Sequence, residues 1–285
     1  MANQGRIPVC FDVLGTCFSF DVAVEALVKV FPDVDRARAD SVIQDWFHSA
    51  QRDFTYASMN DDYKPIAQVL KATLPRIYAM HRLVSPSTSP VESARLVEPV
   101  FDSIKRMRPR PGLRSCAQTL KKRPGRESTN LEFDLIAVTN GGLETTRNYF
   151  SNAFSDGREE FEWWSFVSCD EIEVAKPDQR VYENVWKRLE KKEEEDETTR
   201  DRRRQEGQEG KGAGVRRGFE KRGWFVASHT WDLHAAKKAG FRTAFVTYEE
   251  HCVVAEIFGE PDVVANDLEE VARRIIEWEE ARQKE

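Results

Sequence analysis

The sequence predicts an α/β fold in which a parallel, Rossmann-like sheet is interrupted by an inserted block of helices. Five short apolar segments, rich in β-branched and aromatic residues and ended by turn residues, indicate buried strands. Helical patterns lie between most of these segments, which favours parallel βαβ units with helices on both faces of the sheet. One long stretch, residues 20–107, has helical patterns and no clear strand, so we expect it to form a separate unit.

The predicted elements follow one another along the whole chain. Core helices are expected at residues 112–122, 178–190 and 232–240, and the last ends at Gly240 because glycine commonly follows the final turn of a helix. The strands are expected at residues 7–12, 134–139, 165–168, 224–228 and 243–247. The inserted block should contain helices at residues 21–30, 35–52 and 64–78.

The same pattern divides the chain into two units. Residues 1–19 and 108–285 should form the sheet core, and residues 20–107 should form an all-helical cap over one edge of the sheet. The proline-containing run RMRPRPG, residues 106–112, is the expected hinge where the chain returns to the core.

Two hydrophilic segments are predicted to be insertions in the core unit. Residues 191–222 are highly charged and almost free of large apolar side chains, so they cannot bury enough surface to offset the entropy lost on ordering. We expect a disordered or partly helical surface insertion there, with a regulatory tail that binds a partner as the alternative. Residues 122–130 are expected to form a shorter loop of the same kind.

Composition and charge exclude several classes of partner. The chain has 285 residues, of which 40% are hydrophobic and 32% charged, with a formal net charge of −6 and a pI near 5.6. This mildly acidic balance provides no basic surface for nucleic acid or for an anionic membrane, and no apolar run approaches the ~20 residues that span a bilayer. The N-terminus lacks the features of a secretory signal.

Cysteine usage indicates a reducing compartment. The five cysteines are scattered, odd in number and free of CxxC spacing, which argues against a disulfide framework and against a thiolate zinc site. We therefore expect a soluble cytoplasmic protein that acts on a small molecule, with neither nucleic acid nor membrane as a partner. The cysteines are Cys10, Cys17, Cys116, Cys169 and Cys252.

Polar residues follow the first four predicted strands. Ligands of parallel α/β sheets bind beyond the carboxyl ends of the strands, so these residues predict a site at that edge. They are Asp12, Thr139-Asn140, Ser168-Cys169-Asp170 and Ser228-His229.

The first motif is FDVLGT, in which Asp12 directly follows an apolar strand. A carboxylate can act as a covalent nucleophile when its lone pairs are aimed and its charge is balanced without being quenched. Gly15 allows a tight turn, and the hydroxyl of Thr16 can hold one carboxylate oxygen. The alternative for an isolated aspartate at a strand end is a turn or helix cap.

Three further motifs follow later strands. TNGG at residues 139–142 offers a hydroxyl, an amide and backbone N–H groups that suit an anion, or it forms an ordinary turn before a helix. Lys176, in VAKPDQRVY, can neutralise a carboxylate in a cleft, or it lies in solvent before a helix. Asp232, in ASHTWD, can cap a helix, or it can hold Lys176 or position a hydrolytic water.

The four motifs in this order, with a helical insert after the first, resemble the haloacid dehalogenase (HAD) superfamily over nearly the whole chain. Within it, the chain is most similar to the L-2-haloacid dehalogenase subgroup. FDVLGT is similar to that subgroup's FDxYGT, KPDQRVY to its KPDxRVY, and HTWDLHAAKKAGF to its NAWDxxGAxxxGF. The resemblance implies a HAD-like hydrolase fold with the helical block as its cap.

The resemblance also implies a reaction. Asp12 would attack C2 of a small 2-haloacid, expel halide and form an aspartyl ester, which water would hydrolyse at the Asp12 carbonyl. By position, Thr16 and Lys176 would orient and neutralise Asp12. Thr139 and Asn140 would hold the substrate carboxylate or the halide.

The remaining residues implied by the resemblance would complete the site. Tyr182, Ser228 and Asp232 would support the lysine and the water, and His229 could activate the water as a general base. Trp231 would contact the substrate. The scheme requires no metal and no other cofactor.

Leu14 separates this chemistry from that of a phosphatase. Most members of the superfamily hydrolyse phosphate esters and carry a second aspartate two positions after the nucleophile, where this chain has Leu14. Leucine cannot protonate a leaving group, and it makes a drier pocket better suited to an alkyl halide. A phosphatase of a small phosphate ester, for which magnesium would be the cofactor, is the alternative. A non-catalytic binding protein with the same fold is another.

The chain departs from the subgroup at several positions. Alignment of WFHSAQRDFTY places His48 where the subgroup has a cap arginine that accepts halide, with Arg52 one turn further on. His48 could bind halide if protonated, and its ordinary pKa is ~6.5; the alternative is a histidine on a buried helical face. His229 replaces an asparagine, Ala227 a serine and Leu14 a tyrosine, which leaves the substrate and halide preference open. Related dehalogenases are often homodimers, so a homodimer is a further expectation.

Overall fold

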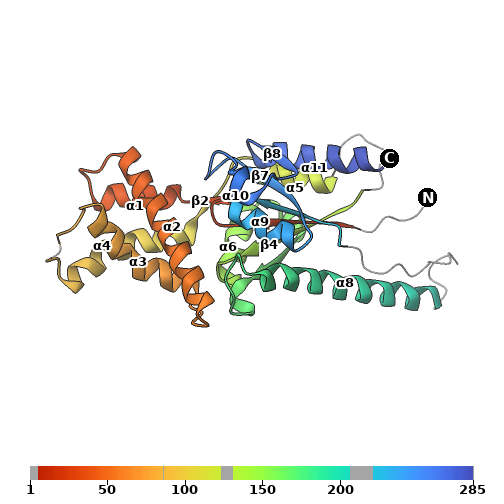
Figure 1. The fold of residues 1–285 in the computed structure, drawn as a ribbon, viewed down its shortest axis with the longest axis horizontal. Helices are drawn as coiled ribbons and strands as arrows, with labels where there is room; N and C mark the ends of the chain where they lie inside the picture. The colour runs from red at the N-terminus through yellow and green to blue at the C-terminus, as the bar shows by residue number, and fades with distance from the viewer. Residues whose placement is uncertain (1–5, 86, 123–130, 206–220, 285) are drawn as a thin grey trace.

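A six-stranded parallel sheet forms the centre of the molecule (Figure 1). The structure is a computed structural model that describes residues 6–85, 87–122, 131–205 and 221–284. The strand order is β5-β4-β1-β6-β7-β8, so β1 lies inside the sheet, and all six of its residues are buried. The strands are β1 (Ile7–Asp12), β4 (Phe133–Thr139), β5 (Trp164–Ser168), β6 (Trp224–Ala227), β7 (Arg242–Val246) and β8 (Val263–Ala265).

The five predicted strands are all present, each within one residue of its predicted ends. Strand β8 was not predicted, because three residues with an exposed central valine give too short an apolar signal.

Helices cover both faces of the sheet, as predicted. Alternate residues of β1 point to opposite faces, so Val9 and Phe11 belong to one hydrophobic cluster and Cys10 to the other. The first cluster includes apolar residues of α5 (Leu113–Lys122), α6 (Leu143–Ala153) and α11 (Leu268–Arg282). The second includes residues of α8 (Gln179–Gln205) and α9 (Thr230–Lys238). Shorter helices are α7 (Arg158–Phe161), α10 (Ala255–Phe258) and the 3₁₀ turn η2 (Cys169–Glu171).

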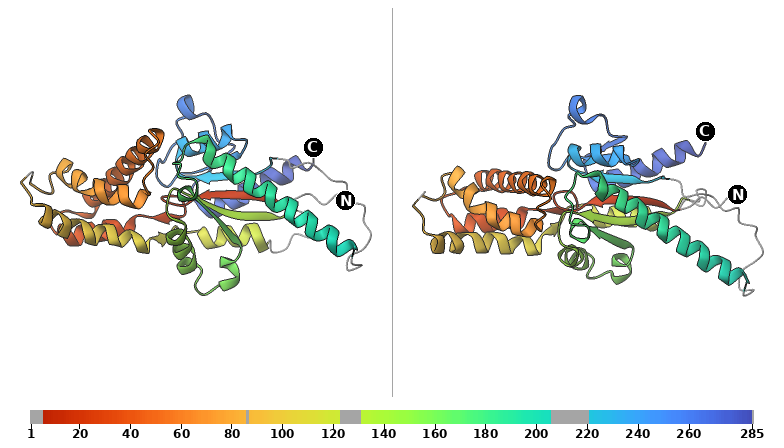
Figure 2. Two further views of the ribbon diagram at one scale, coloured as in Figure 1. Left: turned by 90° about the horizontal axis from the view of Figure 1, so that it is seen from below. Right: turned by 60° about the horizontal axis from the view of Figure 1, so that its bottom comes forward.

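The inserted segment is helical and lies beyond the carboxyl edge of the sheet (Figures 1 and 2). Helix α2 runs seven residues past its predicted end, to Met59. Helix α4 was not predicted, because two prolines and a serine-rich start obscure its pattern. The helices are α1 (Asp21–Val30), α2 (Arg36–Met59), α3 (Ile66–Met80), α4 (Pro90–Ser103) and the 3₁₀ turn η1 (Ile104–Arg106).

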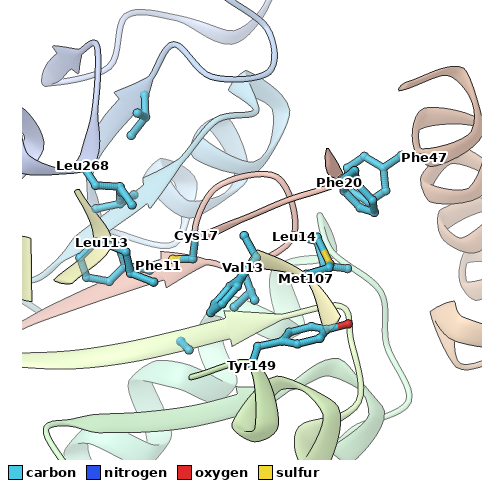
Figure 3. Packing of buried hydrophobic residues seen from close by; sticks show 14 of the residues in the cluster. Phe11, Val13, Leu14, Cys17, Phe20, Phe47, Met107, Leu113, Tyr149 and Leu268 are labelled. Atoms are coloured by element: carbon cyan, nitrogen blue, oxygen red, sulfur yellow. The ribbon is translucent and has the colours of Figure 1, made fainter. Parts of the chain in front are cut away.

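Two chain segments join the helical block to the core. They pair as short antiparallel strands, β2 (Phe18–Ser19) with β3 (Arg108–Pro109). Figure 3 shows the apolar side chains around this junction: Val13, Leu14, Cys17 and Met107 belong to one buried cluster, in which Phe20 meets Phe47 of α2 with ring centroids 4.3 Å apart. The loop after β1 is thus embedded in the core.

The charged insertion is helical over its first part. Helix α8 continues to Gln205, well beyond its predicted end at residue 190, and projects away from the sheet (Figures 1 and 2). Backbone carbonyls of Glu194 and Glu195 accept hydrogen bonds from Thr198 and Thr199 along this stretch. Residues 206–220 of the insertion, and residues 123–130 of the shorter predicted loop, lie outside the described residues.

Candidate active site

The carboxyl edge of the sheet brings together residues that are far apart in the sequence. Asp12 is the last residue of β1, Lys176 lies between β5 and α8, and Asp232 lies in the first turn of α9. Asp12 is 6% exposed, and the other two are fully buried. The helical block faces this edge (Figure 2).

Lys176 lies between two carboxylates. Its Nζ donates to Oδ1 of Asp12 at 2.6 Å and to Oδ2 of Asp232 at 2.7 Å, with a third contact to the carbonyl oxygen of Val138 at 3.3 Å. The hydroxyl of Tyr182 donates to Oδ1 of Asp232, so both oxygens of Asp232 are engaged. Because Lys176 divides its charge between the two carboxylates, it balances Asp12 without pairing with it alone.

Thr16 holds the other oxygen of Asp12. Its Oγ1 donates to Oδ2 of Asp12 at 2.7 Å and accepts from the backbone N–H of Ser228 at 2.9 Å. The loop between them turns at Gly15, whose φ of 86° lies in the left-handed region that favours glycine. Thr16 therefore links the end of β1 to the end of β6.

Burial and charge act in opposite directions on the ionisable groups. Burial raises the pKa of Asp12, the charge of Lys176 lowers it, and the net pKa lies well below its ordinary value. Burial lowers the pKa of Lys176, but the two carboxylates raise it above its ordinary value. Burial raises the pKa of Asp232. The charge of Lys176 thus keeps Asp12 as an ionised carboxylate.

The predicted anion-binding turn lies next to this cluster. Oδ1 of Asn140 accepts the backbone N–H of Lys176 at 3.0 Å, and Oγ1 of Thr139 accepts that of Gly141 at 2.9 Å. Both side chains are buried. Because the oxygen of Asn140 is already used, an anion at this turn would be met by its amide nitrogen.

His229 lies beside Asp12 with its ring unpaired. Its Nδ1 is 3.7 Å from Oδ2 of Asp12, beyond hydrogen-bonding distance. Neither ring nitrogen makes a hydrogen bond within the described part of the chain, although the residue is 1% exposed. The rings of Phe47 and Trp231 lie 6.0 and 5.4 Å away between centroids. A buried polar ring in this situation is suited to meet a substrate or a water.

Ser228 and Leu14 complete the surroundings of Asp12. Ser228 reaches Thr16 through its backbone N–H, whereas its side-chain Oγ is buried and makes no hydrogen bond to the described residues. Leu14 is buried in the loop after β1 (Figure 3), and one of its methyl groups lies 4.0 Å from the position a Cβ would take on Gly141. This side of the site is apolar.

The structure corrects one alternative for His48. The residue is exposed on α2, so the interpretation as a histidine on a buried helical face is wrong. Its ring centroid is 6.4 Å from that of His229, which places it at the outer side of the cluster. Partial desolvation by the surrounding protein, and then the neighbouring His229, lower the pKa of His48 below its ordinary value. Arg52 does not join the cluster, because it pairs with Asp53.

Two pairs of residues near the site were not found from the sequence. Thr55 and Ser58 of α2 hold the segment that carries Lys176: Thr55 Oγ1 donates to the carbonyl of Lys176 at 3.1 Å, and Ser58 Oγ accepts the N–H of Ala175 at 3.0 Å. Arg110 and Glu249 contact the loop at Gly15. Thr55 stands within the run used to align His48 and Arg110 within the predicted hinge run, but neither was predicted to contact the site, and Glu249 belongs to no recognisable motif.

A pocket of about 360 Å³ lies away from the Asp12 cluster, between α5 and α6, and its lining includes Arg110, Leu113 and Phe154 but no residue of that cluster.

The described residues contain neither a cluster of metal-binding side chains nor a membrane-spanning helix. No group of three or more histidine, cysteine, aspartate or glutamate side chains is arranged there to hold a metal ion. No helix in the described ranges is long and apolar enough to span a membrane.

Several solved structures with a similar fold are dehalogenases. The L-2-haloacid dehalogenase of Xanthobacter autotrophicus is 18% identical over 95% of this chain and 98% of that one, with a TM-score of 0.63. The same enzyme with chloropropionic acid covalently bound has a TM-score of 0.64 at 17% identity and covers the same shares. A defluorinating L-2-haloacid dehalogenase is 15% identical over 95% of each chain, with a TM-score of 0.64.

A different kind of relative also shares the fold. YfnB of Bacillus subtilis, assigned as a HAD-hydrolase and solved with magnesium, is 13% identical over 95% of this chain and 98% of that one, with a TM-score of 0.58. No protein-family model and no curated protein sequence matches the chain. The structural likeness confirms the prediction of a HAD-type α/β fold.

Proposed function

We propose that this chain is a hydrolase that displaces halide from a small 2-haloacid through an aspartyl ester on Asp12. The observation that carries the proposal is the setting of Asp12: a buried, ionised carboxylate held by Thr16 on one oxygen and by Lys176 on the other. Such a carboxylate is aimed and partly neutralised, which suits nucleophilic attack. The covalent chloropropionic acid complex of the Xanthobacter enzyme supports the same substrate class for this chain.

The first step forms the ester. A carboxylate oxygen of Asp12 attacks C2, the carbon–halogen bond breaks, and the halogen leaves with the bonding electrons as halide. The configuration at C2 inverts. His48, when protonated, accepts the halide at the outer side of the site, and the amide nitrogen of Asn140 meets the substrate carboxylate.

The second step releases the product. Water attacks the carbonyl carbon of the Asp12 ester, the Asp12–substrate bond breaks, and a 2-hydroxy acid leaves as the carboxylate of Asp12 is restored. His229 takes one proton of the water, because its ring makes no hydrogen bond within the described residues and lies beside Asp12, and it passes this proton to the departing alkoxide; the second proton of the water leaves the restored Asp12 carboxyl for solvent. Asp232 is less suited to that role, since its two oxygens are held by Lys176 and Tyr182.

The residues present do not fit the magnesium site of a phosphatase. Leu14 stands where a phosphatase has its second aspartate, and it is buried. Asp232 turns both oxygens to protein donors. A magnesium-dependent phosphatase thus has less support than a dehalogenase, and it is one outcome of the test below.

Halide release is the direct test. Purified protein is incubated with a panel of chloro-, bromo- and fluoro-acids, and halide is measured by ion chromatography, with Asp12→Asn as the matched inactive variant. We expect halide from at least one 2-haloacid with the natural chain and none with Asp12→Asn. In water labelled with oxygen-18, a single turnover should place the label in the Asp12 carboxylate, as detected by peptide mass spectrometry.

Two results would contradict the proposal. Halide release that survives in Asp12→Asn would show that another group attacks carbon. No halide from any acid, together with magnesium-dependent phosphate release from small phosphate esters, would establish the phosphatase instead.

A further inference from the structure

Arg110 ties the hinge to the loop that follows Asp12. It lies just after β3, where the chain returns from the helical block. Its backbone N–H donates to the carbonyl of Cys17 at 2.8 Å, and its Nε donates to the carbonyl of Gly15 at 3.1 Å. One residue thus holds the loop at two points.

Glu249 closes on the same loop from the other side. It follows β7, its side chain is 1% exposed, and it forms an ion pair with the Nη2 of Arg110, whose side chain is 19% exposed. The Cγ of Glu249 lies 3.1 Å from the position a Cβ would take on Gly15, and the Cε1 of His229 lies 3.2 Å from that position. Gly15 is therefore enclosed by Arg110, Glu249 and His229.

The position of Gly15 determines that of its neighbours. Thr16 follows it directly and donates to Asp12 at 2.7 Å, so a shift of the Gly15 backbone moves the hydroxyl that aims the carboxylate. A misplacement of about 1 Å can cost ~10²-fold in rate even when the change lies outside the reacting groups.

We propose that Arg110 and Glu249 are positioning residues that hold Gly15, and through it Thr16 and Asp12, in the geometry required for attack on carbon. The inference rests on the proposed function for its kinetic part, and the loop geometry tests it independently. Arginine is required because separate nitrogens of its planar guanidinium reach the Gly15 carbonyl and Glu249 together. The N–H groups of lysine all lie on one nitrogen, so lysine cannot replace this pair of directed contacts.

The variants are Arg110→Lys, which keeps the charge, and Glu249→Gln, which keeps the shape. Glu279→Gln is the matched control: Glu279 is also a buried glutamate, paired with Arg222 and Arg242, but it lies at the amino ends of β6 and β7. It should lower stability in a comparable way without touching the loop.

Kinetics and hydrogen exchange are measured on all three variants. We expect kcat for halide release to fall ~10²-fold in Arg110→Lys and Glu249→Gln, with KM changed less than about threefold, while Glu279→Gln keeps kcat within about twofold. The rate of ester formation on Asp12 should fall in parallel. The amides of Gly15 and Cys17, which donate to the carbonyls of Phe18 and Val13, should exchange faster in the first two variants only.

A double variant, Arg110→Met with Glu249→Leu, keeps the proposal testable if a single variant fails to fold. It removes both charges together and so leaves no unpaired buried ion. It should fold, exchange quickly at Gly15 and remain slow in ester formation.

Unchanged exchange at Gly15 and Cys17, or unchanged kcat with a loosened loop, would overturn the inference. If the natural chain releases no halide from any acid, the proposed function fails, but the exchange rates still decide whether Arg110 and Glu249 hold the loop.

Discussion

At the scale of single residues, the two histidines of the site differ in how deeply they are buried. His229 is buried beside Asp12, whereas His48 is exposed on α2 and belongs to the helical block. The pKa of His48 is lowered, so at neutral pH its imidazole is uncharged. A neutral imidazole binds halide more weakly than a permanently charged guanidinium does.

This difference predicts a pH dependence. As pH falls through the lowered pKa of His48, the imidazole gains its charge, so halide release should increase as pH falls below about 6.5, the ordinary histidine pKa. His48→Arg carries a permanent charge, and it should remove this increase and raise kcat/KM at pH 8 by about tenfold. His81→Arg is the control, because His81 lies on the same block but pairs with Asp45. The pH profiles of halide release check the prediction, and an identical profile in His48→Arg would exclude His48 as the halide acceptor.

The sequence predicted which side chains meet at the site better than it predicted what holds them. Asp12, Thr16, Lys176 and Asp232 each stood in a motif that follows a predicted strand, and they converge in the structure. The hydrogen bond from Thr55 to the carbonyl of Lys176 joins two residues far apart in the sequence, so no local sequence pattern could predict it.

At the scale of elements, a buried ion network fastens α11 to the sheet. Glu279 of α11 is fully buried, and its carboxylate accepts from Arg222 at 2.5 Å, from Trp224 at 2.9 Å and from Arg242 at 3.0 Å. A carboxylate removed from water is stable only with such complete pairing, and loss of its charge leaves two arginines unbalanced.

Glu279→Gln should therefore destabilise the protein by about 3 kcal/mol, because the amide can still accept from Trp224 but no longer balances Arg222 and Arg242. Urea unfolding followed by tryptophan fluorescence measures the loss. Glu195→Gln, which removes the charge of an exposed glutamate paired with Lys191 at 3.8 Å, is the control and should change stability by less than ~0.5 kcal/mol. Equal effects of the two substitutions would show that the buried network adds nothing specific.

The strands and helices differ in how clearly the sequence predicts them. Buried strands of a parallel sheet are continuous apolar runs, so five of six were found with their ends. The charged run after residue 190 was expected to be disordered or partly helical, and α8 continues through it to Gln205. Charge content predicted that this stretch would be exposed; it did not determine the backbone conformation, since glutamate, lysine and arginine are good helix formers.

At the scale of the whole molecule, the helical block and the projecting end of α8 differ in their contacts with the sheet core. Two short paired strands join the helical block to the core. Thr55 and Ser58 of this block contact the segment that carries Lys176, so the block helps to hold the site in place. The projecting end of α8 is different. Trp186 is buried against the core and Lys192 reaches Asp134 at 3.1 Å, while residues 193–196 are exposed.

Removal of residues 193–212 should therefore leave both fold and turnover nearly intact. The deletion begins after Lys192 and so keeps the ion pair of Lys192 with Asp134, and the eight residues 213–220 remain as a linker, about 26 Å long when extended. We expect a melting temperature within about 2 °C of the natural chain and kcat within about twofold, because little apolar surface is lost. Scanning calorimetry and halide release measure the two quantities.

A deletion that starts at Trp186 is the control and should destabilise the protein, because it removes a buried aromatic side chain. Loss of soluble protein in the shorter deletion would instead show that the charged segment is part of the folded core.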